Sequence, residues 1–216
     1  MFIRAPPSTL SSLGGTVTLL DRNIEQAFMR SLLLFLLLTA GPAFAQFGFP
    51  TQLPKQTTEA DIRNRVAQYC RLDYTGGRLS DADFEKMKSV VNWPKNPEYP
   101  LIDVVARYDV GSSPSYVHGN KWSIHVTYHL LGRFNLGQGY STDGAGSEKE
   151  ADITVQDVNG ELKVVDVDPN YPRPSRAAML KWLQEKEAAA TDSATKVIYE
   201  QAVKDLSAQS GSPFAK

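Results

Sequence analysis

The sequence predicts a single α+β domain, in which a curved four-stranded antiparallel meander packs on N-terminal and C-terminal helices. Three patterns predict it. Apolar residues recur at helical spacing before residue 92 and again after residue 175, they alternate with polar residues between residues 101 and 167, and Asn159-Gly160 joins two alternating segments. A composition of 42% hydrophobic and 22% charged residues is that of an ordinary globular protein. We place the domain at residues 57–208 and expect a disordered tail at 209–216.

A short apolar segment precedes the domain. Residues 29–45, MRSLLLFLLLTAGPAFA, combine a positive Arg30, a run of leucines and small residues at positions 43 and 45. This order is typical of a secretory signal peptide, so we expect cleavage between Ala45 and Gln46 and export to the periplasm or the extracellular space. The run is shorter than the roughly 20 residues of a membrane span, so we expect no stable membrane anchor.

The other residues before the domain carry no periodic pattern. Residues 1–28 contain Asp21 and Glu25, which suits neither a targeting sequence nor a folded element. We therefore expect translation to start at Met29 and residues 1–28 to be a wrongly assigned extension. Residues 46–56 mix proline and glycine with isolated apolar residues, which predicts an irregular leader.

Two helices are predicted at the start of the domain. Thr58 and Asp61 form a capping-box pattern, and the apolar stripe after them continues until Gly76-Gly77, where we expect the first helix to end. Ser80 is a good N-cap for a second helix over residues 81–91, which the following Asn-Trp-Pro ends because proline cannot continue a helix.

Alternating apolar and polar residues then predict four strands, over residues 101–110, 116–131, 149–158 and 161–167. The second is long for a strand, so we expect a bend or a bulge in it. Five glycines between residues 132 and 146 predict a mobile connection.

The last two strands are predicted to form a hairpin. Asn159-Gly160 is typical of a type I′ turn, which determines the register of the two strands. Counting outward from the turn pairs Val155 with Val164, and Ile153 with Asp166, on the face toward the core.

Two further helices are predicted after the sheet. Ser175 is a good N-cap, and the apolar residues after it predict a helix that reaches about Ala190. A thinner apolar stripe predicts a last helix from Ala194 to Leu206.

Several classes of function are not indicated by the sequence. The formal net charge is −1, and no basic patch typical of nucleic-acid binding is present, so we expect no nucleic-acid partner. Cys70 is the single cysteine, which excludes an intramolecular disulfide, and its place on the apolar stripe of the first helix predicts a buried, inert thiol. Neither a nucleophile motif nor a phosphate-binding glycine loop is present, so we expect no cofactor.

Two patterns resemble metal ligands but do not match a metal site. Residues 166–170 have the oxygen spacing of a calcium loop, yet Tyr171 stands where such a loop needs glycine. His125 and His129 share one strand face about 13 Å apart, too far for one metal ion. We therefore expect no metal site and two half-exposed histidines.

Two acidic side chains are predicted at positions where a carboxylate is costly. Asp73 continues the apolar stripe of the first helix, and Asp166 faces inward beside Ile153 in the predicted register. An ionised, unpaired carboxylate in a core costs several kcal/mol, so each must be paired, protonated or at the mouth of a cavity. A purely structural role is the alternative, in which Asp73 closes its helix and Asp166 accepts a turn or arginine hydrogen bond.

The helix pair, the long bent strand and the hairpin, over residues 57–168, resemble the cone-shaped roll of the nuclear transport factor 2-like, or more broadly cystatin-like, superfamily. The resemblance implies a pocket between the concave side of the sheet and the helices, where polyketide cyclase-like and dehydratase-like members use an Asp or His as acid or base. On this resemblance Asp73 and Asp166 are the candidate catalytic residues. The candidate ligand-binding residues that line the pocket are Tyr69, Tyr108, Trp122 and Tyr128.

Three functions follow from these patterns. The first is an exported, non-catalytic module that binds a small molecule or a protein through an aromatic-lined concave face of the sheet, because no catalytic motif is present. The second is a cofactor-free acid/base enzyme, of the isomerase, dehydratase or cyclase type, that uses an inward aspartate. The third is a structural subunit that assembles, for instance as a homodimer, through the polar sheet face that carries Arg107, Asp109, His125 and His129.

Overall fold

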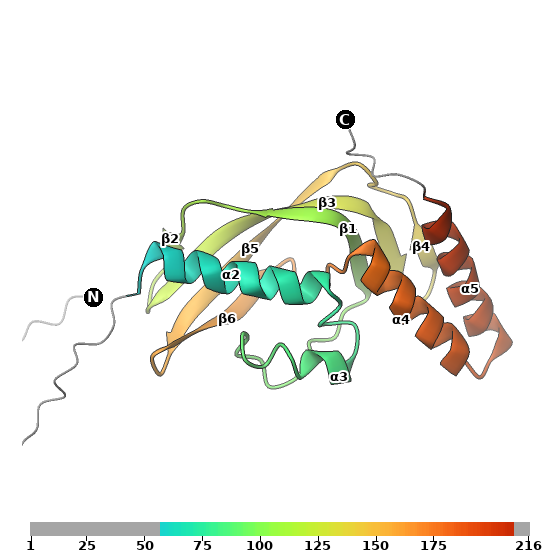
Figure 1. Cartoon of the computed structure of the whole chain (residues 1–216), viewed down its shortest axis with the longest axis horizontal. Coiled ribbons are helices and arrows are strands. Elements are labelled where there is room, and N and C mark those ends of the chain that lie inside the picture. Colours follow the sequence, from blue (N-terminus) through green and yellow to red (C-terminus); the bar gives the residue numbers. More distant parts are fainter. Residues whose placement is uncertain (1–56, 210–216) are drawn as a thin grey trace, which may run out of the picture. The chain divides into compact units, whose positions relative to one another are not determined.

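The computed structural model describes residues 57–209. In this part the chain forms an α+β fold with four helices and an open antiparallel sheet of six strands (Figure 1). The helices are α2 (Glu59–Tyr74), α3 (Asp81–Phe84), α4 (Arg176–Ala189) and α5 (Ser193–Ala208). The strands are β1 (Leu101–Val110), β2 (Ser115–Tyr116), β3 (Lys121–Asn135), β4 (Gly139–Ser141), β5 (Glu148–Val158) and β6 (Glu161–Asp168).

The sheet has the order β1-β3-β5-β6, and the short strands β2 and β4 each pair with β3. These two short strands were not predicted. The predicted extension, signal peptide, cleavage site and leader lie outside the described residues, as does all but Gln209 of the predicted tail.

The first predicted helix is confirmed, but the second is much shorter than predicted. Thr58 caps α2 through a complete capping box: its side chain accepts a hydrogen bond from the Asp61 backbone, and the Asp61 carboxylate accepts one from the Thr58 backbone. Helix α3 has 4 residues instead of the eleven expected over 81–91. The reason is a distant contact, because Asn92 donates its backbone N–H to the carbonyl of Val164 in β6 at 2.8 Å, while Val164 donates to Val90 at 2.9 Å. A helix through Val90 would remove this pairing.

The predicted strand over 116–131 and the connection after it are both corrected. Ser115 and Tyr116 form β2, which turns back to pair with Ser123 and Trp122 at the start of β3. Strand β3 then continues to Asn135, inside the segment where we expected a mobile connection, and β4 pairs with its end. Gly132 lies next to this pairing in the chain, and a Cβ atom there would collide with the Tyr140 hydroxyl and the Ser141 carbonyl. The absence of a side chain at Gly132 allows the strands to approach closely, so this glycine does not indicate a flexible loop.

The hairpin register is correct near its turn and wrong beyond it. Asn159 and Gly160 have φ values of 56° and 84°, as a type I′ turn requires, and Val155 pairs with Val164 as predicted. The register then shifts by one residue, so that Ile153 pairs with Val167 and not with Asp166. The bulge turns Asp166 toward solvent, which contradicts its predicted inward position.

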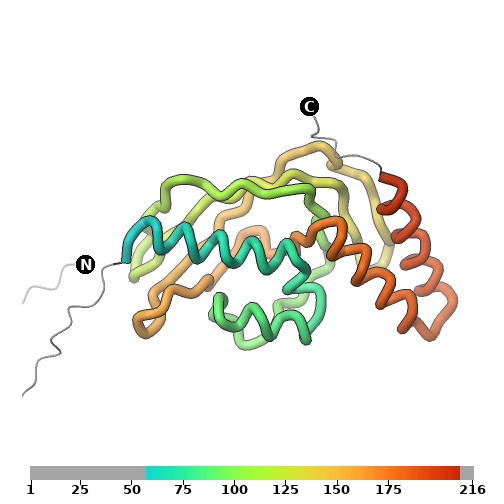
Figure 2. The backbone as a smooth tube through the Cα atoms, in the orientation of Figure 1, coloured from blue at the N-terminus to red at the C-terminus, as the bar shows by residue number. Residues whose placement is uncertain are grey.

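Bulges also bend the other side of the sheet. The register between β1 and β3 shifts on both sides of Val105, which confirms the expected irregularity. Pro172 and Pro174 accept hydrogen bonds of 3.0 Å from the backbones of Asp103 and Val105, so the chain before α4 runs along the edge of β1. Figure 2 shows the strands bending toward α4 and α5 at this end.

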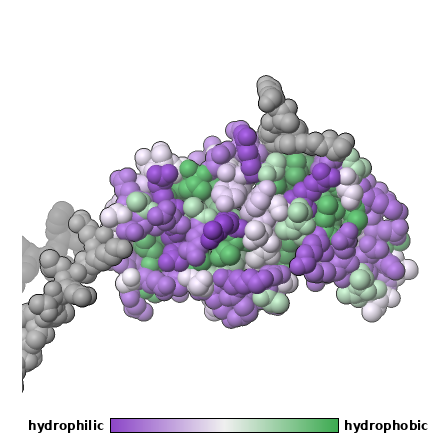
Figure 3. Space-filling model, in the orientation of Figure 1, coloured by the Kyte–Doolittle hydropathy of each residue, from purple (hydrophilic) through white to green (hydrophobic). Residues whose placement is uncertain are grey.

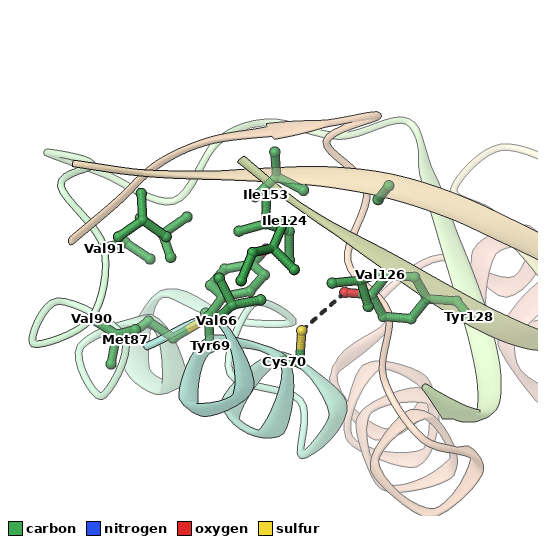
Figure 4. Close-up of a cluster of buried hydrophobic side chains, with 14 of the residues drawn as sticks. Val66, Tyr69, Cys70, Met87, Val90, Val91, Ile124, Val126, Tyr128 and Ile153 are labelled. Atoms are coloured by element: carbon green, nitrogen blue, oxygen red, sulfur yellow. Dashed lines mark hydrogen bonds between the residues drawn. The ribbon is translucent and has the colours of Figure 1, made fainter. Parts of the chain in front are cut away.

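The core consists of two clusters of buried side chains. The first lies between α2 and the sheet and contains Tyr69, Cys70, Tyr128 and Ile153 (Figure 4). The second joins α4 and α5 to β1, β3 and β4, with Phe134 at its centre beside Trp182. The buried Cys70 is therefore a core residue, as its position on the apolar stripe predicted.

Candidate functional site

The predicted aromatic residues lie together on the α2 side of the sheet, but two of them are covered. Tyr69 and Tyr128 are fully buried, whereas Tyr108 and Trp122 are half-buried at the edge of the first cluster. The rings of Tyr108 and Tyr128 lie 6.2 Å apart, while Trp122 contacts Tyr116 of β2 at 6.2 Å. The four rings therefore form part of the packing between α2 and the sheet.

Asp73 is buried at the end of α2, as predicted, and two arginines lie near it. Arg78 follows α2, Arg173 precedes α4, and all three side chains are at most 1% exposed. Asp73 accepts a hydrogen bond on Oδ2 from the Arg173 backbone at 3.2 Å. We call Asp73, Arg78 and Arg173 the buried charged cluster. Neither arginine was predicted from the sequence, because both lie in segments without helical or strand periodicity of apolar residues.

Aromatic rings and carbonyl oxygens compensate the two guanidinium groups. Arg173 lies 4.5 Å from the centre of the Tyr128 ring and donates to the carbonyls of Pro169 at 2.7 Å and Tyr171 at 3.1 Å. Arg78 lies 5.2 Å from the Trp93 ring and donates to the Tyr69 hydroxyl at 3.2 Å. Cation–π contacts of this kind are stronger when water is excluded. The cluster thus joins the end of α2 to the loop that follows α2 and to the loop that precedes α4.

Burial controls the ionisation of this region. It raises the pKa of the Asp73 carboxyl, and the Arg78 and Arg173 guanidiniums oppose that rise. Burial also raises the pKa of Cys70 to about 12, although a contact of 3.4 Å with the Tyr128 hydroxyl opposes it. Cys70 therefore holds its proton at neutral pH. Protein atoms enclose Asp73, so a substrate reaches it only if the surrounding loops open.

Asp166 does not join Asp73. It is exposed, and its carboxylate accepts a hydrogen bond of 2.9 Å from the backbone of Val167, the next residue along β6. The predicted pair of inward carboxylates is therefore reduced to Asp73 alone, because the bulge in β6 moves Asp166 to the other face of the sheet.

The polar face of the sheet holds each histidine between two carboxylates. His125 is exposed, with Nδ1 2.6 Å from Asp152 and Nε2 3.0 Å from Glu150. His129 is buried, which contradicts the half-exposed position we expected, and its Nε2 lies 2.7 Å from Asp109. The carboxylates of His125 meet opposite nitrogens of one ring, so they cannot share a metal ion with it. Within residues 57–209 no group of three or more such side chains could hold a metal ion.

An open groove is lined in part by Tyr74, the last residue of α2. We call it the α4 groove; its volume is about 580 Å³. Its walls come from the end of α2, the bulged part of β1 and β3, the start of α4 and the residue after α5. They are Tyr74, Val105, Ala106, Leu131, Ser175, Arg176, Ala177, Leu180 and Gln209. Figure 3 shows hydrophobic residues that reach the surface between polar ones on the face of α2 and α4.

Most polar groups of the α4 groove are already bonded to protein. The Tyr74 hydroxyl donates to the Ala106 carbonyl at 2.8 Å, and the Gln209 amide donates to the Leu131 carbonyl at 3.0 Å. Arg176 differs, because it donates through Nη2 to the Ser207 carbonyl at 2.6 Å while its buried Nε has no partner. Among the described residues, no carboxylate forms an ion pair with Arg176. The groove thus combines an apolar wall with one arginine that has no carboxylate partner among the described residues.

The α4 groove was not predicted from the sequence. The cap at Ser175 and the helix after it were predicted, but Gln209 was assigned to the tail and the bulge at Val105 has no local pattern. No protein-family model, curated protein or solved structure matches the chain. None of the helices between residues 57 and 209 is long and apolar enough to cross a membrane.

Proposed function

We propose that the chain is an exported, non-catalytic binding module and that the α4 groove holds its ligand, a small apolar molecule with an anionic group. One observation carries the proposal: a groove of about 580 Å³ has mainly apolar walls and an arginine without a carboxylate partner. Pockets for small molecules have volumes of about 300–1,000 Å³ and combine apolar walls with a few polar groups that orient the ligand. Export rests on the signal-peptide pattern of residues 29–45.

The groove replaces the aromatic concave face as the site of binding in this proposal. Tyr69 and Tyr128 are covered by Arg78 and Arg173, so a ligand would have to displace a buried charge to reach them. Displacing a buried, compensated charge costs several kcal/mol. The α4 groove is open, so a ligand can enter it without displacing a buried charge.

The finer architecture belongs to the same proposal. We take β1, β3, β5 and β6 as a curved meander on N-terminal and C-terminal helices, similar to the cone-shaped roll of the nuclear transport factor 2-like superfamily. The strand order and the bulges in β1 and β6 support this resemblance.

Thermal unfolding of the chain from Gln46 onward, in the presence of decanoate or decanol, tests the proposed function. We expect decanoate to raise the Tm in a saturable way and decanol to raise it less, because only decanoate pairs with Arg176. Arg176→Gln removes the difference between the two compounds, whereas Arg63→Gln, on the exposed side of α2, keeps it.

A second pair of variants shows where the probe binds. Ala177→Trp places a large ring in the α4 groove and should abolish the effect of decanoate, and Ala188→Trp, also exposed on α4, should preserve it. An unchanged Tm with both compounds, or an effect that survives Ala177→Trp, contradicts the proposed site.

The same protein tests the two other functions predicted from the sequence. An acid/base enzyme that uses Asp73 would need its substrate to reach a side chain that is 1% exposed. If this function is correct, the NMR titration of the Asp73 carboxyl should change when a substrate analogue is added. A structural subunit that assembles through Arg107, Asp109, His125 and His129 would appear as a dimer or larger assembly in light scattering.

A further inference from the structure

A second hollow lies between α3, α4 and α5, separate from the α4 groove. Its volume is about 500 Å³, and three aromatic residues line it: Tyr99, Trp182 and Tyr199. The rings of Trp182 and Tyr199 meet edge to face at 6.1 Å. We call this the aromatic hollow. None of these three residues was among the candidate ligand-binding residues predicted from the sequence.

Two buried polar atoms of the aromatic hollow have no partner in the described structure. Trp182 is 6% exposed, and its indole Nε1 donates to no acceptor. The Asn96 side chain donates from Nδ2 to the Arg78 carbonyl at 2.9 Å, while its Oδ1 accepts nothing. A buried polar group without a partner destabilises the fold, and native proteins contain few of them. Both atoms belong to residues that line the hollow but have almost no accessible surface, so a ligand gains this donor and this acceptor only by shifting the lining side chains.

The buried charged cluster holds this wall in place. The Arg78 carbonyl accepts from Asn96 and also from the Tyr99 hydroxyl, both at 2.9 Å. Arg78 is itself fixed by Tyr69 and Trp93, so its backbone is a rigid support for two lining side chains.

The charges around the hollow do not favour an ion. Asp81 and Glu98 are acidic and Lys186 is basic, and the Lys186 ammonium lies 5.6 Å from the Trp182 ring. Charges of both signs at one opening give no strong preference for an anion or a cation. A neutral ligand that presents both hydrogen-bond donors and acceptors fits these walls better than a charged one.

We infer that the aromatic hollow binds a neutral, hydroxyl-rich ligand of the saccharide class. A hydroxyl both donates and accepts, so the hydroxyls of one saccharide suit both the Trp182 Nε1 donor and the Asn96 Oδ1 acceptor. A sugar ring also has an apolar C–H face that packs on an aromatic ring, which Tyr99, Trp182 and Tyr199 supply. This site is independent of the ligand proposed for the α4 groove.

Titration of the ¹⁵N-labelled chain from Gln46 onward with maltotriose tests the inference by NMR. The sequence has 3 tryptophans, so the three indole N–H signals can be assigned by substitution. We expect the Trp182 signal to shift in a saturable way. Trp182→Phe keeps an aromatic ring but loses the donor, and we expect about twofold to tenfold weaker binding, the range of one hydrogen bond of about 0.5–1.5 kcal/mol.

Two control variants distinguish binding in the aromatic hollow from binding elsewhere on the domain. Trp122→Phe, at the opposite end of the sheet, should leave the affinity for maltotriose unchanged, and Ala177→Trp should leave it unchanged even if it blocks decanoate. Three results overturn the inference: no saturable shift of the Trp182 signal, equal affinity in Trp182→Phe, or binding of glucuronate or glucosamine in preference to neutral maltotriose. Failure of decanoate to bind the α4 groove leaves this test unaffected.

Discussion

The guanidinium of Arg173 covers the ring of Tyr128 at 4.5 Å from its centre, in a place that water does not reach. Arg173 comes from the loop before α4, and Tyr128 from the middle of β3. The same loop runs along β1 and donates a backbone hydrogen bond to Asp73 at the end of α2. A single buried residue thus connects three separate parts of the domain.

We predict that Arg173→Ala destabilises the domain by about 3–5 kcal/mol, since it leaves Asp73 with a less compensated charge and removes the contact with Tyr128. Arg63→Ala, on the exposed side of α2, should change the stability by less than about 0.5 kcal/mol. Urea unfolding followed by circular dichroism measures both. A loss below about 1 kcal/mol for Arg173→Ala would show that the cluster contributes little to the fold.

Local patterns predicted the elements that depend on local chemistry. The capping box at Thr58 and the turn at Asn159-Gly160 each satisfy backbone groups within a few residues, so sequence spacing is sufficient to find them. The helix after Ser80 was predicted too long because Val90 and Asn92 pair with Val164, a contact between segments far apart in the chain.

The candidate site was harder to predict for the same reason. Asp73 was found because it continues a helical stripe. Arg78 and Arg173 lie in loops, where no period shows which side chains turn inward. One bulged residue in β6 was enough to reverse the predicted orientation of Asp166, since side chains alternate between faces along a strand.

We predict that Gly132→Ala destabilises the domain by about 1–3 kcal/mol, because the added Cβ would lie 2.5 Å from the Ser141 carbonyl and the strands would have to separate. Gly137→Ala is the matched control: it lies in the turn between β3 and β4, and its Cβ would meet only Asn135 Oδ1 at 3.7 Å. Thermal unfolding of both variants checks the prediction. Equal Tm values would mean that β4 is not held against β3.

We predict that the polar face of the sheet makes stability depend on pH through His125. Hydrogen bonds to Asp152 and Glu150 raise the pKa of His125 above its ordinary value of about 6.5. The charged form is favoured in the folded state, so its contribution is complete below about pH 6.5 and is lost as the pH rises through the raised value. The ring is exposed, so the effect is small and screened by salt.

Urea unfolding of the wild type and His125→Gln between pH 5.5 and pH 8.5 measures this contribution. The difference in stability between the two should be largest at the acidic end and should shrink as the pH rises. The NMR titration of the His125 ring should have its midpoint above about 6.5. A midpoint at or below that value would contradict the two ion pairs.

We predict that Cys70 does not react with thiol reagents in the folded protein. Burial raises its pKa to about 12, so at pH 8 only about one thiol in ten thousand is ionised, and α2 and Tyr128 cover the sulfur. In urea the thiol should react with 5,5′-dithiobis(2-nitrobenzoate) within minutes, as an exposed cysteine does. Arg173→Ala loosens the cover over Tyr128, so we expect it to speed the reaction in the absence of urea, whereas Arg63→Ala should not. Rapid reaction of the native wild type would show that the cluster around Asp73 opens readily, and the enclosed site would then be open to small molecules.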